Sequence, residues 1–157
     1  INLEILNVSS DAIDIDFGNG EIINSDFEKI SGDAIDLSGS RVFINNIRVL
    51  KVADKAISVG EKSILNIDKL NISNSRIGIA SKDSSKVEGK KIKIFDCGLY
   101  DFAVYQKKSY FSGAYLNVQA ETSCKDSIVQ EGSELLVNNK KINQEVFDVK
   151  KLYDGTL

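Results

Sequence analysis

Hydrophobic residues return to equivalent positions every 22 residues along much of this chain. The segments DAIDI, DAIDL, KAISV and IGIAS centre on Ile13, Ile35, Ile57 and Ile79, each 22 residues after the last. Three further columns recur at 22 or 23 residues: Val42, Leu65 and Val87; Ile47, Leu70 and Ile92; and Phe27, Val49, Ile72 and Ile94. A fixed period of this length indicates a repeat protein whose units bury their apolar faces against their neighbours.

Within each unit the apolar residues alternate with polar ones, which is the period of a β-strand. One unit contains three such pairs, namely Ile35 and Leu37, Val42 and Ile44, and Ile47 and Val49. Ser, Gly, Asn and Lys separate the pairs, as is typical of turns. The leucine–asparagine signature of a leucine-rich repeat is missing. The sequence therefore predicts an all-β, right-handed parallel β-helix of about six coils of roughly 22 residues, with three short strands per coil.

The repeat also predicts how the domain is organised. We expect a single domain over residues 1–157, with a partial N-terminal coil at 1–10, coils at 11–142 and a C-terminal cap at 143–157. The period loosens around 106–115, where aromatic and basic residues suggest a protruding loop. The N-terminal end has no evident cap, and an open end of this kind exposes unpaired strand edges that invite association.

Charge excludes some classes of function. The 157 residues include 20 basic and 23 acidic ones, well mixed along the chain, for a formal net charge of −3. Nucleic-acid-binding proteins concentrate Lys and Arg on one face, so we expect no nucleic acid partner. We also expect no membrane span, because no run of about 20 apolar residues is present. No signal segment is evident at the N-terminus.

Four residue types are missing from the chain, namely Pro, Trp, Met and His. The absence of Pro suits continuous strand ladders, in which nearly every backbone N–H donates a hydrogen bond. The absence of His removes the commonest general base and every Ser–His or Cys–His nucleophile pair. Because the chain lacks Met, we expect a processed form or a fragment of a larger protein.

The units GDAIDLSGS, KAISVGEKS and RIGIASKDSSKV resemble the right-handed parallel β-helix superfamily, the pectate-lyase-like superhelix, over residues 11–142. They are particularly similar to repeats of secreted bacterial proteins of the NosD type and to segments attached to CotH-type spore-coat proteins. The resemblance implies the fold and an exported protein, periplasmic or at the cell surface. It does not select a function, since the superfamily hosts lyases, hydrolases, adhesins and passive spacers.

The lyases of this superfamily use an Arg or Lys base opposite acid-bound calcium. The three arginines of the chain are Arg41, Arg48 and Arg76. None is expected opposite an Asp-rich strand, so the pattern disfavours lyase activity.

Asp14 and Asp36 are the candidate catalytic acids, because the repeat places them in one outward column of the first strand. The column is expected to continue with Ser58, Ala80 and Tyr105. Carboxylates about 5 Å apart are typical of retaining glycosidases. Calcium would need several more oxygen ligands, for which Asp11, Asp16 and Asp33 are near in sequence. The alternative is that these aspartates only solvate an exposed face, and no metal site or cofactor is assigned.

The turn after the first strand supplies a candidate ligand-binding site. Its residues are Lys82, Asp83, Tyr105, Lys107, Lys108 and Tyr110. By the repeat, Lys107 follows Lys82 in one column and Lys108 follows Asp83 in the next. Charged groups beside aromatic rings can bind a carbohydrate or a protein. The alternative is a ladder of surface ion pairs, which contribute little to stability.

Cys97 and Cys124 are the two cysteines of the chain, and both are expected near one corner of neighbouring coils. They could lie within disulfide reach or remain a pair of small buried thiols. Two Cys without His cannot form a zinc site.

These patterns favour a non-catalytic structural or recognition module that binds a polysaccharide or a cell-surface partner. Two alternatives stay open. The first is a carbohydrate-active enzyme, a lyase or hydrolase, that uses Asp14 and Asp36 as stacked carboxylates. The second is an assembly scaffold that associates through its open N-terminal end.

Overall fold

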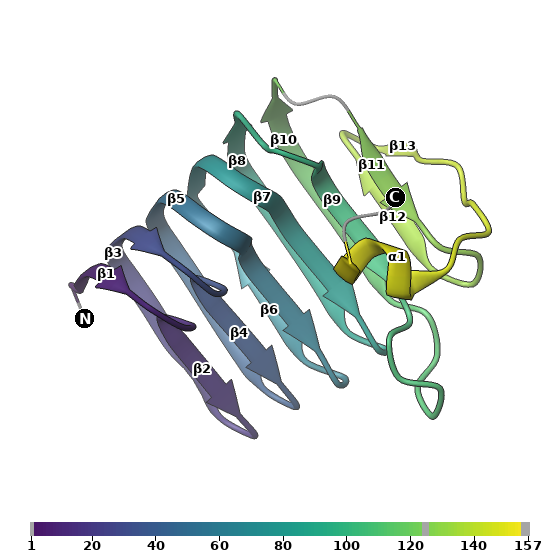
Figure 1. Cartoon of the computed structure of the whole chain (residues 1–157), viewed down its shortest axis with the longest axis horizontal. Helices are drawn as coiled ribbons and strands as arrows, with labels where there is room; N and C mark the ends of the chain where they lie inside the picture. The colour runs from purple at the N-terminus through teal and green to yellow at the C-terminus, as the bar shows by residue number, and fades with distance from the viewer. Residues whose placement is uncertain (1, 124–125, 155–157) are drawn as a thin grey trace.

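The computed structural model, which describes residues 2–123 and 126–154, is a parallel β-solenoid of about six turns with a spacing of about 22 residues (Figure 1). The predicted parallel β-helix is confirmed. The strands are β1 (Glu4–Val8), β2 (Ile13–Asp16), β3 (Asn19–Ile30), β4 (Ile35–Ser38), β5 (Arg41–Gly60), β6 (Ile64–Ile67), β7 (Leu70–Lys82), β8 (Lys86–Phe95), β9 (Tyr100–Tyr105), β10 (Tyr115–Thr122), β11 (Ser127–Val129), β12 (Glu134–Val137) and β13 (Lys140–Lys141). One helix, α1 (Val149–Asp154), follows them.

The first face of the solenoid consists of β2, β4, the ends of β5 and β7, β9 and β11. Along it, Ile13, Ile35, Ile57, Ile79 and Phe102 are neighbours on successive strands. Ile35, Ile57 and Ile79 are fully buried. The predicted ladder of inward isoleucines is confirmed, and it forms because a 22-residue coil returns the same side chain to the same place.

The second face contains the start of β3, the start of β5, β6, the start of β8, the start of β10 and β12. Its buried ladder consists of Val42, Leu65, Val87, Leu116 and Leu135. Val42 and Leu65 pair directly although 23 residues separate them. The extra residue lies in the preceding turn, which holds two consecutive residues with positive φ, 56° and 64°. The turn therefore absorbs the irregular spacing without disturbing the ladder.

The corner between the second and third faces depends on the left-handed backbone conformation. Asn24 and Asn46 have φ values of 51° and 54°, and Lys91 has 53° at the same corner two turns later. Asn tolerates this conformation better than most residues do. Asn46 Nδ2 also donates a hydrogen bond to Asn24 Oδ1 over 2.9 Å, so stacked corners support one another.

The register of the fifth turn differs from the prediction. Ala103 pairs with Ala80, and Tyr105 pairs with Lys82. The expected columns, in which Tyr105 follows Ala80 and Lys107 follows Lys82, are therefore wrong. The turn before β9 holds one residue more than the turn before the end of β7, and the sequence comparison misplaced this insertion.

After β12 the chain leaves the parallel ladder. β13 pairs with β12 in the antiparallel direction, and Glu145 then forms a parallel bridge with Gln130. Helix α1 lies against the outer side of the first face, where Leu152 packs in a second apolar cluster with Ala80, Ala103 and Ile128 (Figure 1). Within the described part of the chain, no helix has the length and apolar character that crossing a bilayer requires.

Candidate functional site

The two predicted acids lie side by side on the outer side of the first face. Asp14 in β2 and Asp36 in β4 are direct neighbours on parallel strands, and Ser58 of β5 follows them. Loss of surrounding water and the charges of Asp16 and Asp36 raise the pKa of the Asp14 carboxyl. A carboxyl with a raised pKa holds a proton more readily, which suits it to donate that proton.

Lys82 reaches this acid pair from β7, two turns further along the solenoid. Its side chain passes over Gly60, where an added Cβ would lie 2.9 Å from Lys82 Cε. Lys82 Nζ ends 3.8 Å from Asp36 Oδ1. Burial, together with the charges of Lys55 and Lys107, lowers the pKa of the Lys82 amine, although Asp36 opposes this effect.

A buried ionic network lies beside Lys82. The ammonium of Lys55, only 4 % exposed, is 3.2 Å from Asp33 Oδ1 and 2.5 Å from Asp54 Oδ2. Arg76 Nη1 is 3.2 Å from the other oxygen of Asp54. Burial acts to lower the pKa of Lys55, but Asp33 and Asp54 outweigh it and raise this pKa. Lys55 is therefore held as a cation.

Sequence reasoning missed this network, although a signal for it was present. Asp11, Asp33 and Lys55 are 22 residues apart and occupy equivalent places in their units. In the structure each carboxylate accepts the backbone N–H one turn later: Asp33 N donates to Asp11 Oδ1 over 2.7 Å, and Lys55 N to Asp33 Oδ1 over 2.9 Å. The spacing marked a hydrogen-bonded column that the sequence analysis considered only as calcium ligands.

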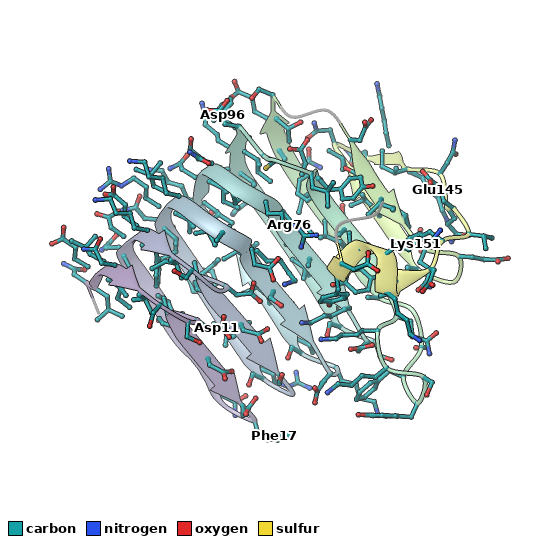
Figure 2. All side chains as sticks on the ribbon, viewed as in Figure 1. Asp11, Phe17, Arg76, Asp96, Glu145 and Lys151 are labelled. Carbon is teal, nitrogen blue, oxygen red and sulfur yellow. The ribbon has the colours of Figure 1, made fainter. Side chains whose placement is uncertain are left out.

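Helix α1 closes the other side of the first face. The hydroxyl groups of Tyr105 and Tyr153 are 2.7 Å apart, and Lys107 Nζ lies 4.6 Å from the centre of the Tyr153 ring. Arg76 Nη2 donates to the carbonyl of Leu152 over 2.6 Å, and Figure 2 shows Arg76 beside α1. Tyr105 is fully buried, so it anchors the helix.

The loop between β9 and β10 holds the remaining predicted ligand-binding residues. Asp83 is buried, and its Oδ1 accepts the backbone N–H groups of Lys107 and Lys108, each over 2.7 Å. The Lys108 ammonium forms an ion pair with Glu61. Tyr110 is 75 % exposed. The structure thus gives Asp83 a role in shaping the loop, whereas Tyr110 and Lys107 face solvent.

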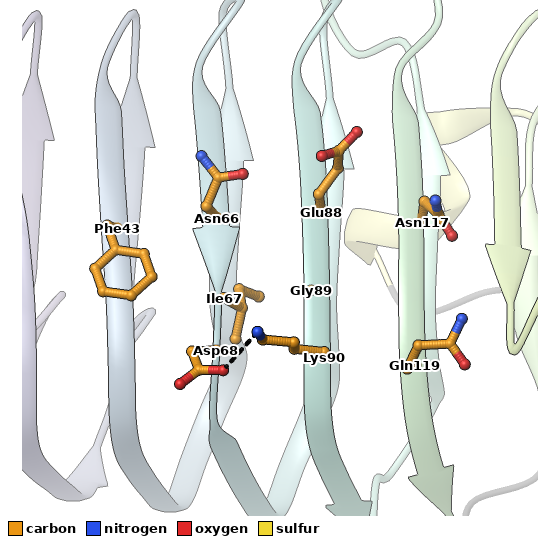
Figure 3. A pocket seen from close by; sticks show the side chains of 9 residues that line it. All are labelled: Phe43, Asn66, Ile67, Asp68, Glu88, Gly89, Lys90, Asn117 and Gln119. Carbon is orange, nitrogen blue, oxygen red and sulfur yellow. Dashed lines mark ion pairs between the residues drawn. The ribbon is translucent and has the colours of Figure 1, made fainter.

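The second face carries a groove that the sequence analysis did not identify. It is open to solvent, has a volume of about 580 Å³ and crosses β5, β6, β8 and β10 (Figure 3). Its lining residues are Phe43, Asn66, Ile67, Asp68, Glu88, Gly89, Lys90, Asn117 and Gln119. The first strand column of the groove runs from Phe43 through Asn66 and Glu88 to Asn117, each the direct neighbour of the next.

The charged groups of the groove are paired with one another. Asp68 Oδ1 lies 3.3 Å from Lys90 Nζ and 3.4 Å from Lys91 Nζ. A hydrogen bond from Lys90, with a further contribution from Lys91, lowers the pKa of the Asp68 carboxyl. Glu88 is 2.9 Å from the Lys86 ammonium. The groove therefore presents ionised carboxylates, side-chain amides and one aromatic ring.

Two further expectations concern metals and thiols. Among residues 2–123 and 126–154, no group of three Asp, Glu, His or Cys side chains is placed to hold a metal ion. Cys97 Sγ is 3.7 Å from Ser75 Oγ. Cys124 lies outside the described residues, and so does any pairing with Cys97.

Comparison with known proteins leaves the fold and the groove as the basis for function. No family model matches the chain, and no curated protein or solved structure matches it significantly.

Proposed function

We propose that this solenoid is a non-catalytic recognition module that binds a carbohydrate chain along the groove of the second face. The column of Phe43, Asn66, Glu88 and Asn117 carries this proposal. Asn side chains both donate and accept hydrogen bonds, as sugar hydroxyls do. An aromatic ring offers an apolar surface to the C–H face of a sugar.

The spacing of the column favours an extended ligand. Neighbouring strands are about 4.8 Å apart, so the four side chains repeat at a regular distance along the solenoid axis. The strand ladders hold the backbone beneath them, and binding does not require a loop to be ordered first. Such preorganisation lowers the entropic cost of association. A polymer that crosses several strands can use the whole row, whereas a small molecule contacts only part of it.

The charges in the groove favour binding over catalysis. A glycosidase needs a carboxylic acid whose pKa is raised so that it can protonate the leaving group. Asp68 has the opposite property, because Lys90 and Lys91 lower its pKa. On the first face, the Lys82 ammonium lies beside Asp36, where a sugar would have to approach an enzyme's acid pair.

The experiment is a glycan array of neutral and acidic oligosaccharides, followed by calorimetric titration of the ligands that bind. Phe43→Ala and Asn117→Ala should weaken binding about tenfold or more. The matched controls are Phe17→Ala and Asn19→Ala, because both residues are exposed and lie outside the groove. Equal loss of binding in the controls, or unchanged binding in both groove variants, would refute the proposal.

We also propose that the module belongs to an exported bacterial protein, periplasmic or at the cell surface. The similarity of the units GDAIDLSGS and KAISVGEKS to NosD-type and CotH-associated repeats supports this assignment. Cell fractionation of the native protein tests it, and recovery in the cytosolic fraction alone would contradict it.

A further inference from the structure

We propose that Lys82 and Asp36 join through an intramolecular amide bond that ties the turn of β7 to the turn of β4. The starting observation is a buried carboxylate oxygen without a hydrogen bond. Asp36 Oδ1 has no hydrogen-bond partner among the described residues, and the Lys82 amine lies 3.8 Å away. A buried, unsatisfied carboxylate oxygen requires a physical explanation, and a Lys–Asp pair awaiting condensation provides one.

The surroundings confine the two groups to this geometry. The Lys82 side chain is 11 % exposed and packs over Gly60, so its amine has little freedom to turn toward water. Ser58, the strand neighbour of Asp36, is fully buried, and its hydroxyl also has no hydrogen-bond partner in the described structure. An amide at this place would supply a carbonyl that the Ser58 hydroxyl can reach. One bond would thereby explain two unsatisfied groups.

The charges around Lys82 favour a reactive amine. Lys55 and Lys107 oppose its protonation, as does burial, whereas Asp36 and Asp33 favour it. The balance lowers the pKa of Lys82, which increases the fraction of the neutral amine that can act as a nucleophile. Asp14, on the strand next to Asp36, has a raised pKa and can supply a proton.

The reaction is a condensation without a change in oxidation state. The neutral Lys82 amine attacks Cγ of the Asp36 carboxylic acid, and an Nζ–Cγ bond forms. Asp14 donates a proton to the departing hydroxyl group and regains one from the nitrogen. The C–O bond breaks, and one water molecule leaves. Fixed proximity of two reacting groups replaces an activating reagent, because effective molarities in such arrangements are very high, on the order of 10⁵ M or more.

A second Lys–Asp pair serves as an internal comparison. Lys55 Nζ is closer to Asp33 Oδ1, at 3.2 Å, and both side chains are buried. Lys55 also contacts Asp54, and its pKa is raised, so it remains a protonated cation that cannot attack a carboxyl carbon. Proximity alone would select the Lys55 pair, whereas the proposal selects Lys82.

The test is mass spectrometry of the denatured protein, followed by peptide mapping after trypsin digestion. The wild-type chain should be lighter than its sequence mass by one water, and a branched peptide should join Lys82 to Asp36. Lys82→Arg and Asp36→Ala should have their full sequence masses, while Lys55→Arg should still lose the water. Circular dichroism of Lys82→Arg checks that the fold is retained.

Mapping is necessary because Asp154 precedes a glycine, and succinimide formation at such a sequence also removes one water. Asp14→Asn should slow formation of the crosslink about tenfold or more after refolding. The proposal is overturned by a wild-type chain without the branched peptide, by a crosslink that maps to Lys55 and Asp33, or by water loss that persists in Lys82→Arg. An unchanged rate in Asp14→Asn would overturn its role as proton donor.

Discussion

Replacing Lys55 with Met tests the buried ionic network directly. The side chains of Lys55 and Asp33 are 5 % and 8 % exposed, and their charged atoms are 3.2 Å apart. At this distance the attraction is about 5 kcal/mol for an effective dielectric constant of about 20. Met keeps much of the side-chain volume but leaves Asp33 buried without its cation. Removing one partner of a buried pair typically costs about 3–5 kcal/mol.

For a domain of this size, that loss should lower the melting temperature by roughly 6–20 °C. Asp54 retains Arg76 at 3.2 Å, so the unpaired charge is mainly that of Asp33. Chemical denaturation measures the change in the free energy of unfolding. The control is Lys93→Met, which removes an exposed lysine paired with Glu121 and should leave the denaturation midpoint unchanged.

The effect of Lys55→Met should depend on pH. Burial already raises the pKa of Asp33, and Lys55 is the main group that opposes this rise. In the variant the pKa of Asp33 should rise further. A carboxyl with a raised pKa in the folded state destabilises the protein above that pKa, and the penalty disappears once the pH falls below the unfolded value of about 3.9. The variant should therefore approach the wild type near pH 4. A difference in stability that stays constant from pH 7 to pH 4 would refute the ionic account.

Three further predictions concern the core and the helix. Ile57→Ala should cost about 2–5 kcal/mol in denaturant unfolding, because Ile57 is fully buried between two isoleucines, and Ile57→Asp should abolish folding by circular dichroism. Tyr153→Phe removes the hydrogen bond to Tyr105 and should cost about 0.5–1.5 kcal/mol while increasing hydrogen exchange in α1. Burial, reinforced by Tyr153, raises the pKa of Tyr105 well above 10.0, so the unfolded chain loses this proton first and stability should fall above about pH 10; Tyr105→Phe should reduce that slope if it folds.

The sequence was sufficient to predict the inward ladders. Ile35, Ile57 and Ile79 recur at one spacing, and alternation within each unit assigns them to strands. Both signals depend on residues that are neighbours in the repeat, so a single sequence contains them. The neighbouring positions of Asp14 and Asp36 follow from the same register. The prediction became wrong at Tyr105, because one inserted residue in a turn shifts every later column and leaves no hydrophobic signature of its own.

The remaining parts of the site depend on contacts that the repeat does not encode. Lys82 spans two turns because its flexible side chain finds space over Gly60, which requires knowledge of the side-chain conformation. The contact between Tyr105 and Tyr153 joins residues 48 positions apart. The groove was overlooked for another reason. Phe43 and Asn66 have ordinary surface neighbours in sequence, and only their shared place on the second face makes them a row.

The distribution of contacts explains why recognition is assigned to the second face. In a solenoid each turn touches only its neighbours, so cooperativity between distant turns needs additional links. The first face supplies such links: Lys82 reaches across two turns to Asp36, and Arg76 binds both Asp54 and the carbonyl of Leu152 in α1. These side chains are consequently committed to holding the molecule together. The polar groups of the groove lie outward on a ladder whose core is already complete. They can exchange water for a ligand without exposing apolar residues, and a binding site can therefore occupy the second face at little cost to stability.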